Sequence, residues 1–291
     1  MTAGLDRYFE RIGYGGPVEP TVDVLRGIHR AHLLAIPYEN FDIHLGRPLR
    51  LDPERFYAKL VDARRGGWCY EMNGLLAWAL RAIGFRVTMV SGTVGRAQRG
   101  DSVEGNHLVL LVDLERPWVA DTGFGDGFLD PVPLAEGEFS QLGLTYRLER
   151  SGARWQFHNQ PWGGAAGFDF TTEPRALADF EARCHDLQTS PESSFVRATV
   201  CERFTPEAIV SLRGAVLRTI TADGPVDVVL TGRQAFERTL EDTFGLDSGP
   251  IGALWPQIEA RHEAWVARTA AEAAAVGASR LPETPSPKRS R

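Results

Sequence analysis

Cysteine, basic charge and long apolar runs are all scarce in this chain. Only three cysteines stand among 291 residues, and none forms a CxxC pair. That count argues against a disulfide framework or a zinc site and favours a reducing cytoplasm. The formal net charge of −6 opposes a nucleic-acid-binding surface, which needs a basic patch. No apolar run approaches the ~20 residues of a membrane helix, and the N-terminus does not resemble a secretory signal. We therefore expect no nucleic acid and no membrane among the partners, and nothing in the composition sets an oligomeric state.

Helical periodicity dominates the first 84 residues. Apolar side chains recur three and four positions apart after Thr21, which predicts a helix starting there. A second helix is predicted from residue 53 to about residue 64, and a third over residues 69–83. Gly84 directly follows the third helix, as a glycine at a helix C-terminus typically does.

The pattern changes to alternation at Phe85, and short strands separated by Gly, Asp and Pro follow. They predict a small antiparallel sheet or barrel, with strands at residues 107–112, 118–121, 145–149 and 155–157. Beyond them we predict helices at residues 174–183, 205–213, 234–244 and 256–275, and a strand at residues 226–230. Residues 282–291, rich in Pro and Ser with a basic end, are predicted to be a disordered tail. The fold class is therefore α+β.

Cys69 is the first candidate for chemistry. Gly66 and Gly67 permit an unusual backbone just before the third predicted helix and deliver Cys69 to its first turn. There the free amides and the positive end of the helix dipole favour a thiolate, which is the nucleophile of acyl transfer. The same amides could bind the oxyanion that forms when a thioester is attacked. The alternative is a small cysteine buried on a core-facing helix.

A base for this nucleophile is predicted at His107, which opens a buried strand, while Asp121 ends the next strand. A hairpin that turns near Leu114 places positions 107 and 121 opposite each other or nearly so, on one face of the sheet. An aspartate on the second ring nitrogen would fix the tautomer and stabilise the imidazolium. The alternatives are a core histidine bonded to backbone and an aspartate that caps a turn.

Two other patterns predict no ligand of their own. His29 and His32 lie three apart on a predicted helix, but no third ligand follows at suitable spacing, so we expect no metal. The glycine-rich stretch at residues 123–127 opens onto Asp130-Pro131 rather than onto a helix, which is not the dinucleotide-binding pattern. It indicates a tight loop that lets backbone approach a ligand, or else a plain surface turn.

Taken together, these motifs resemble those of the arylamine N-acetyltransferases. The stretch Arg65-Gly66-Gly67-Trp68-Cys69-Tyr70-Glu71-Met72-Asn73 resembles the family's active-site signature. In the same order along the chain, further matches cover roughly residues 5–245. They are Ile36-Pro37-Tyr38-Glu39-Asn40, Asn106-His107, Asp121-Thr122-Gly123-Phe124-Gly125 and Thr189-Ser190-Pro191-Glu192-Ser193-Ser194-Phe195.

The resemblance implies a transglutaminase-like or cysteine-protease-like core in three domains. These would be a helical bundle at residues 1–84 with the nucleophile, a β-barrel at 85–190 with the His and Asp, and a linker and α/β lid at 191–281. It also implies a function: transfer of acetyl from acetyl-coenzyme A to arylamines, arylhydrazines or hydrazides. The reaction would follow a ping-pong mechanism through an acetyl-cysteine.

The resemblance also assigns roles to individual residues. Cys69 would be the acetylated nucleophile, His107 the base and Asp121 the residue that orients it. Tyr38 and Phe124 would line the acceptor pocket, where the ring of the acceptor can stack. Gly123 and Gly125 would lie near the pantetheine of the coenzyme.

Two positions depart from the family's usual pattern. The family often has Phe where this chain has Tyr38, and Val where it has Thr122. Both changes add a hydroxyl to the expected pocket, so they bear on the preferred acceptor and not on the chemistry.

Three other functions compete with this one. An amide synthase that closes a macrolactam from a carrier-bound polyketide would share the three catalytic residues and need a wider cleft. A cysteine protease would share their order along the chain, although no secretion signal or pro-segment supports it. A catalytically silent binding protein is opposed by the intact set of Cys, His and Asp.

Overall fold

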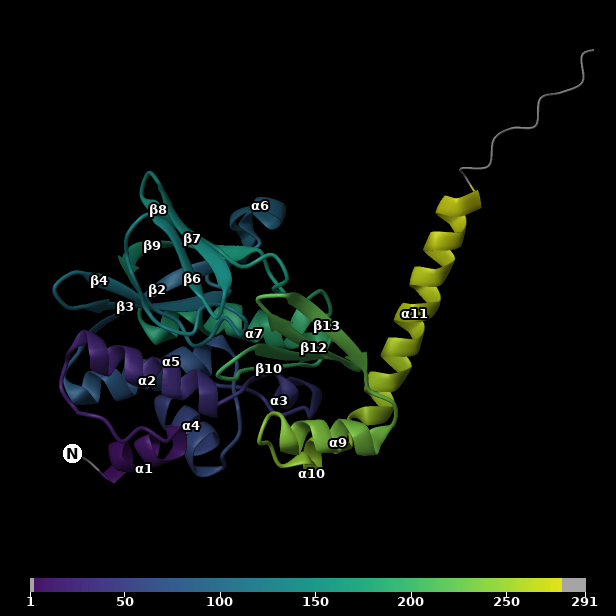
Figure 1. The fold of residues 1–291 in the computed structure, drawn as a ribbon, viewed down its shortest axis with the longest axis horizontal. Helices are drawn as coiled ribbons and strands as arrows, with labels where there is room; N and C mark the ends of the chain where they lie inside the picture. The colour runs from purple at the N-terminus through teal and green to yellow at the C-terminus, as the bar shows by residue number, and fades with distance from the viewer. Residues whose placement is uncertain (1–2, 279–291) are drawn as a thin grey trace, which may run out of the picture.

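The structure is a computed structural model and describes residues 3–278 of the chain. The predicted tail at residues 282–291 therefore lies outside the described residues. Mixed helix and sheet make up the fold, with one eight-stranded and one five-stranded antiparallel sheet. Figure 1 shows the N-terminal helices gathered below the larger sheet, with the smaller sheet beside them.

The N-terminal helices enclose one apolar core. They are α1 (Ala3–Ile12), α2 (Val22–Ala35), α3 (Phe41–His44), α4 (Pro53–Tyr57), the π-helical turn η1 (Ala58–Asp62) and α5 (Cys69–Ile83). The three helices expected here are confirmed, the second as α4 continued by η1. The side chain of Thr21 caps α2 by accepting from the amide of Val24 at 3.4 Å, and such a cap is worth about 1 kcal/mol. Gly84 ends α5 in a left-handed conformation with φ 108°.

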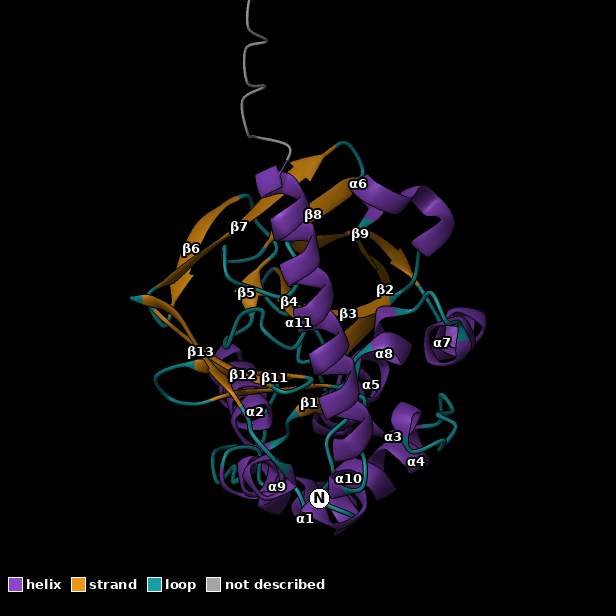
Figure 2. Ribbon diagram, turned by 90° about the vertical axis from the view of Figure 1, so that its right-hand side faces the viewer, coloured by secondary structure: helices purple, strands orange, loops and turns teal. Residues whose placement is uncertain are grey.

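The eight-stranded sheet curls into a half-barrel, with strand order β5-β4-β3-β2-β9-β8-β7-β6 (Figure 2). Its strands are β2 (Arg86–Val94), β3 (His107–Asp113), β4 (Pro117–Ala120), β5 (Val132–Pro133), β6 (Gly137–Gln141), β7 (Leu144–Ser151), β8 (Arg154–His158) and β9 (Gly167–Pro174). Two short helical turns, α6 (Arg96–Arg99) and η2 (Gly100–Val103), separate β2 from β3. The four strands predicted in this region correspond to β3, β4, β7 and β8. Helix α5, which carries Cys69, packs against strands β2 and β3 of this sheet.

The five-stranded sheet joins one short strand of the N-terminal region to four strands near the C-terminal end, with strand order β1-β10-β11-β12-β13. Its strands are β1 (Tyr38–Glu39), β10 (Val200–Phe204), β11 (Ile209–Arg213), β12 (Val216–Thr221) and β13 (Gly224–Val229). The strand predicted at residues 226–230 is confirmed as β13. Because β1 pairs with β10, residues far apart in sequence meet at this sheet.

Two predicted helices are wrong. Residues 209–213 of the predicted helix 205–213 form strand β11 instead. The hydroxyl of Thr205 accepts from the amides of Glu207 and Ala208 at 3.3 and 3.0 Å, and Thr205 N donates to Ala208 O at 2.8 Å. The Thr-Pro-Glu sequence, interpreted as a helix start, therefore closes a turn between two strands.

The other wrong prediction is the helix at residues 174–183, which begins too early. Residue 174 ends strand β9, and the amide of Arg175 still bonds to Met89 O of β2 at 2.8 Å. A 3₁₀ turn, η3 (Leu177–Phe180), follows, and the helix proper is α7 (Glu181–Thr189).

The remaining helices are α8 (Ser194–Arg197), α9 (Arg233–Asp242), α10 (Ser248–Gly252) and α11 (Trp255–Ala278). Both helices predicted for the C-terminal part are confirmed, as α9 and α11. Helix α9 packs a buried cluster of Phe236 and Leu240 against the five-stranded sheet, whereas α11 projects away from the body of the molecule (Figure 1). Among the described residues, no helix combines the length and apolar composition that crossing a membrane requires.

Candidate active site

The segment that carries Tyr38 lies directly beside the residues that precede Cys69. Glu39 N donates to Gly67 O at 2.9 Å and Gly67 N donates to Pro37 O at 3.2 Å, which pairs Tyr38 with Gly67 in a parallel bridge. The expected acceptor residue Tyr38 and the expected nucleophile Cys69 are thereby brought to one place from positions 31 residues apart.

Buried charges hold this arrangement. Arg65 Nη2 lies 2.7 Å from Glu39 Oε1, and Lys59 Nζ lies 2.8 Å from Glu71 Oε2. Glu71 also accepts from the amide of Trp68 at 3.2 Å and so caps the start of α5. Removing one partner of a buried ion pair costs about 3–5 kcal/mol, because the other charge is left uncompensated. These residues therefore fix the backbone on which Cys69 stands.

Cys69 is the first residue of α5 and is 2% exposed. Its Sγ lies 3.9 Å from the carbonyl oxygen of Asn106, the residue before His107. Burial, and then the charge of Asp121, raise the pKa of the Cys69 thiol well above its ordinary value, while backbone groups of Leu108 and Tyr70 lower it. The helix start thus lowers the pKa of Cys69, as expected from the sequence. Burial raises this pKa and is the larger effect.

His107 opens β3 and Asp121 directly follows β4, and their side chains meet. His107 Nε2 lies 2.6 Å from Asp121 Oδ2, with both side chains almost fully buried. The β3–β4 register pairs Asp113 with Pro117, so the hairpin turns one residue later than Leu114. Positions 107 and 121 are therefore diagonal rather than opposite, and they still share a face because the shift is two residues. In the described part of the chain His107 Nδ1 makes no hydrogen bond, so this ring nitrogen is free of the contact that holds Nε2.

Asp121 is held by three further contacts. Its Oδ1 accepts from Asn73 Nδ2 at 2.7 Å and from Gly123 N at 2.9 Å. Its own amide donates to His29 Nε2 at 3.0 Å. Sequence reasoning gave Asn73 no role, although it follows Cys69 by four residues and therefore lies on the same face of α5. This four-residue spacing from Cys69 is the feature of the sequence that could have predicted a role for Asn73.

His29 is a second functional neighbour that the sequence did not reveal. Its Nε2 accepts from Asp121 N, and its Nδ1 lies 2.9 Å from Leu129 O, to which it must donate. Burial lowers the pKa of His29, which keeps this neutral tautomer. His32, the other member of the pair, instead bonds to the hydroxyl of Tyr8 at 2.9 Å. Both contacts depend on residues distant in sequence, which explains why spacing alone did not predict them.

The loop after Asp121 runs across the face of Cys69. A Cβ placed on Gly123 would lie 2.6 Å from Cys69 Cα, so only glycine permits this approach. Gly125 has φ +88°, a conformation that side chains other than glycine rarely adopt. The ring of Phe124, between them, lies 5.6 Å from the His107 ring, centroid to centroid. The predicted loop thus touches Cys69 and carries an aromatic ring to His107.

Tyr38 approaches the same place from strand β1. It is 7% exposed, and burial raises its pKa, with the charges of Cys69, Glu202 and Asp126 adding to the effect. In the cross-strand register its partner is Glu202. The structure therefore gathers every residue that the sequence singled out for the site, namely Cys69, His107, Asp121, Tyr38, Phe124, Gly123 and Gly125.

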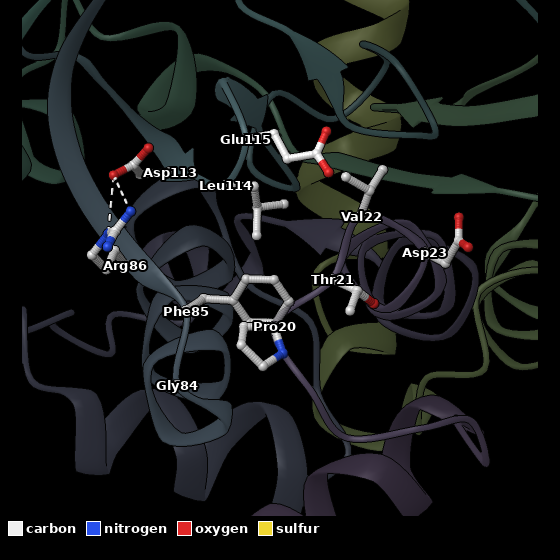
Figure 3. Close-up of a pocket in the computed structure, with 10 residues that line it drawn as sticks. All are labelled: Pro20, Thr21, Val22, Asp23, Gly84, Phe85, Arg86, Asp113, Leu114 and Glu115. Carbon is white, nitrogen blue, oxygen red and sulfur yellow. Dashed lines mark hydrogen bonds and ion pairs between the residues drawn. The ribbon is translucent and has the colours of Figure 1, made fainter.

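A hollow of about 460 Å³ lies elsewhere, where the start of α2 meets the ends of β2 and β3 (Figure 3). Its wall includes Phe85, Leu114 and the ion pair of Arg86 with Asp113, whose Nη2 and Oδ2 are 2.8 Å apart. It contains no cysteine or histidine, so the acyl chemistry is not expected there.

Comparison with known proteins decides the family. A sequence model described as N-acetyltransferase matches residues 21–249, and an arylamine N-acetyltransferase of Mycolicibacterium smegmatis is 35% identical over 260 residues. The latter match covers 86% of this chain and 94% of the relative. The chain belongs to the arylamine N-acetyltransferase family. It is accordingly an acyltransferase.

Other arylamine N-acetyltransferases agree in sequence and in structure. A pineal gland isozyme of Gallus gallus is 31% identical over 271 residues, covering 83% of this chain and 93% of the relative. The Mycobacterium marinum enzyme, whose structure was solved in complex with CoA, matches with a TM-score of 0.79 and 32% identity. That match covers 88% of this chain and 97% of the other. The family suggested by the cysteine motif is thus confirmed.

Proposed function

We propose that this enzyme transfers acetyl from acetyl-coenzyme A to arylamines, arylhydrazines or hydrazides through an acetylated Cys69. The observation that carries the proposal is a cysteine at a helix start whose Sγ lies 3.9 Å from the carbonyl oxygen of Asn106, next in sequence to a histidine whose Nε2 bonds to a buried aspartate at 2.6 Å. Membership of the family supports the reaction, and the relative solved with CoA supports the donor.

In the first half-reaction the Cys69 sulfur attacks the thioester carbonyl of acetyl-coenzyme A. The proton of the Cys69 thiol already resides on His107 Nδ1 in the proposed resting ion pair, and the Asp121 carboxylate stabilises the imidazolium. Amides at the start of α5 face the oxyanion of the tetrahedral intermediate. When this intermediate collapses, the carbon–sulfur bond to the coenzyme breaks. His107 returns its proton to the departing thiolate, and free coenzyme A leaves.

In the second half-reaction the acceptor nitrogen attacks the acetyl group on Cys69. His107 takes a proton from that nitrogen, and the Cys69 sulfur leaves as the thiolate, which restores the enzyme. In this proposal Tyr38 and Phe124 hold the ring of the acceptor. Gly123 and Gly125 lie near the pantetheine, because a chain without side chains leaves room for it.

The resting charge of Cys69 depends on two opposing effects. Burial raises the pKa of the lone thiol, whereas an imidazolium on His107, stabilised by Asp121, favours the thiolate through direct attraction. We propose that the second effect prevails, so that Cys69 and His107 rest as an ion pair. The pair would lose reactivity as the pH falls through the pKa of the thiol.

Two measurements test the function. Intact-mass spectrometry after mixing with acetyl-coenzyme A alone should show one added acetyl group, on Cys69 by peptide mapping. Initial-rate plots against acetyl-coenzyme A at several concentrations of 4-methylaniline should be parallel, as in ping-pong kinetics. Intersecting plots without an acetyl-enzyme would mean direct transfer in a ternary complex. They would remove Cys69 from the role of nucleophile.

Three features of the sequence interpretation remain predictions in this proposal. They are the division at about residues 84 and 190, the likeness of the core to transglutaminases and cysteine proteases, and the cytoplasm as the compartment. The reduced cysteines Cys69, Cys184 and Cys201 support the last of these.

A further inference from the structure

Two buried carboxylates lie at the far end of the loop that crosses Cys69. Glu202 stands on β10 opposite Tyr38 in the cross-strand register, and Asp126 follows Gly125 directly. A Cβ placed on Gly164 would lie 3.5 Å from Asp126 Oδ2 and 3.9 Å from Glu202 Oε1. The two side chains therefore approach the same point, although Glu202 comes from strand β10 and Asp126 from the segment after β4.

Only neutral groups bond to these carboxylates in the described part of the chain. Asp126 accepts from Asn159 Nδ2 at 3.0 Å and from the amide of Gly164, and Glu202 Oε1 accepts from Ser211 Oγ at 2.9 Å. Burial raises the pKa of both acids, and the nearby charge of Asp126 raises that of Glu202 further. The exposed Arg213, at the end of strand β11, lowers the pKa of both acids. Two close carboxylates without a cation are expected to retain a proton.

Two polar groups at this point have no partner among the described residues. Glu202 Oε2 makes no hydrogen bond there, and it lies 1.8 Å from where a Cβ of Gly125 would be. The same position is 3.5 Å from the ring of Tyr38, whose hydroxyl also makes no hydrogen bond in the described chain. The residues are 8% and 7% exposed. Neither atom is among the fully buried side-chain polar atoms that lack a partner in the described chain, so both remain accessible to a ligand that supplies donors.

We propose that Glu202 and Asp126 are specificity-determining residues that bind a second, cationic group on the acceptor. The preferred acceptors would be arylamines that carry an ammonium group on the ring, away from the nitrogen that is acetylated. This inference rests on the proposed function, because it assigns the far end of the same acceptor site.

The spacing of the loop supports this reach. Gly123 touches the backbone of Cys69 and Gly125 touches the Glu202 carboxylate. Two residues of chain span at most about 7 Å, so the two ends of this bent loop lie within the length of an aromatic ring that carries a nitrogen at each end. A bound cation would let both carboxylates ionise, and it would gain charge-assisted hydrogen bonds in a site of low polarity.

The test compares two amines of similar shape. One is 4-(aminomethyl)aniline, whose alkylamine is protonated at neutral pH, and the other is the neutral 4-methylaniline. The wild-type enzyme should favour the cationic amine in kcat/KM by roughly tenfold or more, the value of one hydrogen bond to a charged group. Glu202→Gln and Asp126→Asn should each reduce this preference at least several-fold, mainly through KM of the cationic amine.

Asp227→Asn is the matched control. Asp227 is an exposed carboxylate of β13 on the same cross-strand row as Glu202, reached through Ser211 and Arg218. The substitution should change neither rate. Should Glu202→Gln fail to fold, the wild-type preference and Asp126→Asn still decide the question. Turnover of both amines without a preference, or a preference that survives Glu202→Gln and Asp126→Asn, would overturn the inference and leave the proposed function intact. Turnover of neither amine would overturn both.

Discussion

At one end of the loop from Asp121 to Gly125, both oxygens of the Asp121 carboxylate have partners, supplied by His107, Asn73 and Gly123. At the other end of the loop, beside Gly125, one oxygen of the Glu202 carboxylate has no hydrogen-bond partner in the described chain. Both ends are buried. The first is arranged before any substrate arrives, as groups that stabilise a transition state must be. The second is left for a ligand to complete, which is where acceptors can be distinguished from one another.

The sharpest way to break this comparison is to remove the nucleophile. Cys69→Ala should lower arylamine acetylation by a factor on the order of 10³–10⁶, as loss of the nucleophile of a triad does. The measurement is turnover of 4-methylaniline, with circular dichroism as the check on folding. Retention of more than about a hundredth of the wild-type rate, against that triad effect, would assign the chemistry to another group.

Asp121→Asn should have the next largest effect, on the order of 10²–10⁴ in kcat, because the wrong imidazole tautomer becomes available. The same variant tests which of two opposing effects, burial or the His107 imidazolium, sets the charge of Cys69. In the wild type, the ion pair should let iodoacetamide alkylate Cys69 well below pH 7. In Asp121→Asn, the imidazolium loses its support and burial prevails, so alkylation should already decline at higher pH.

The alkylation is followed by peptide mass spectrometry, which separates Cys69 from Cys184 and Cys201. A wild-type reactivity pKa at or above the free value of ~8.5 would contradict the resting ion pair. In that case His107 would act only during the attack, as a general base on a neutral thiol.

Two matched substitutions in the loop separate its ends directly. A Cβ in Gly123→Ala would meet Cys69 Cα at 2.6 Å and its carbonyl oxygen at 2.8 Å. Displacing the nucleophile by about 1 Å can cost on the order of 10²-fold, so Cys69 loading should slow. In Gly125→Ala the Cβ would meet Glu202 Oε2 at 1.8 Å instead, and strain at its positive φ adds about 1–3 kcal/mol.

Because Gly125 lies near the pantetheine in the proposed function, Gly125→Ala should slow both half-reactions. The acceptor half should slow more, because the added Cβ also displaces the Glu202 carboxylate. Rapid-quench mass spectrometry measures the loading of Cys69, and decay of the acetyl-enzyme on adding amine measures the second half. If both alanine variants impaired the same half-reaction to the same degree, the two ends of the loop would not have separate functions.

The sequence predicted the reacting groups better than the groups that position them. Cys69 and His107 stand at the starts of regular elements, where periodicity and capping locate them well. The contacts of His29 form only when α2 meets the segment after β4, and those of Glu202 only when β10 meets β1 and β11. No local pattern encodes either. The exact register could not be predicted either, because the centre of the turn lies one residue later than Leu114, which shifts the strand pairing by two residues.

The wrong helix at residues 205–213 has a related cause. Thr205-Pro206-Glu207 satisfies the rule for a helix start and equally that for a turn closed by a threonine hydroxyl. Pairing of the next residues with β10 and β12 decides between them. Tertiary hydrogen bonding therefore overrides the local preference at this point.

The smallest effect on the rate is expected from the two other cysteines. Cys201 follows Val200 on β10 and precedes Glu202, so strand alternation turns its side chain away from the acceptor end. It packs with Phe236 and Leu240 of α9 in a separate cluster. Cys184 of α7 is 2% exposed in the apolar core that includes Cys69, and its Sγ lies 3.7 Å from Gln188 Nε2. Among the described residues, neither thiol makes a hydrogen bond to a residue of the loop from Asp121 to Gly125.

Cys184→Ala and Cys201→Ala should each lower the free energy of unfolding by about 1–3 kcal/mol through lost packing. The rate at which acetyl-coenzyme A loads Cys69 should stay within about twofold, since an effect under 0.4 kcal/mol on the barrier is a factor of about two. Urea unfolding gives the first quantity and rapid-quench mass spectrometry the second. Burial raises the pKa of both thiols, so neither is suited to act as a thiolate near neutral pH. Loss of loading in either variant, with its unfolding transition still cooperative, would show that a second cysteine takes part in the chemistry.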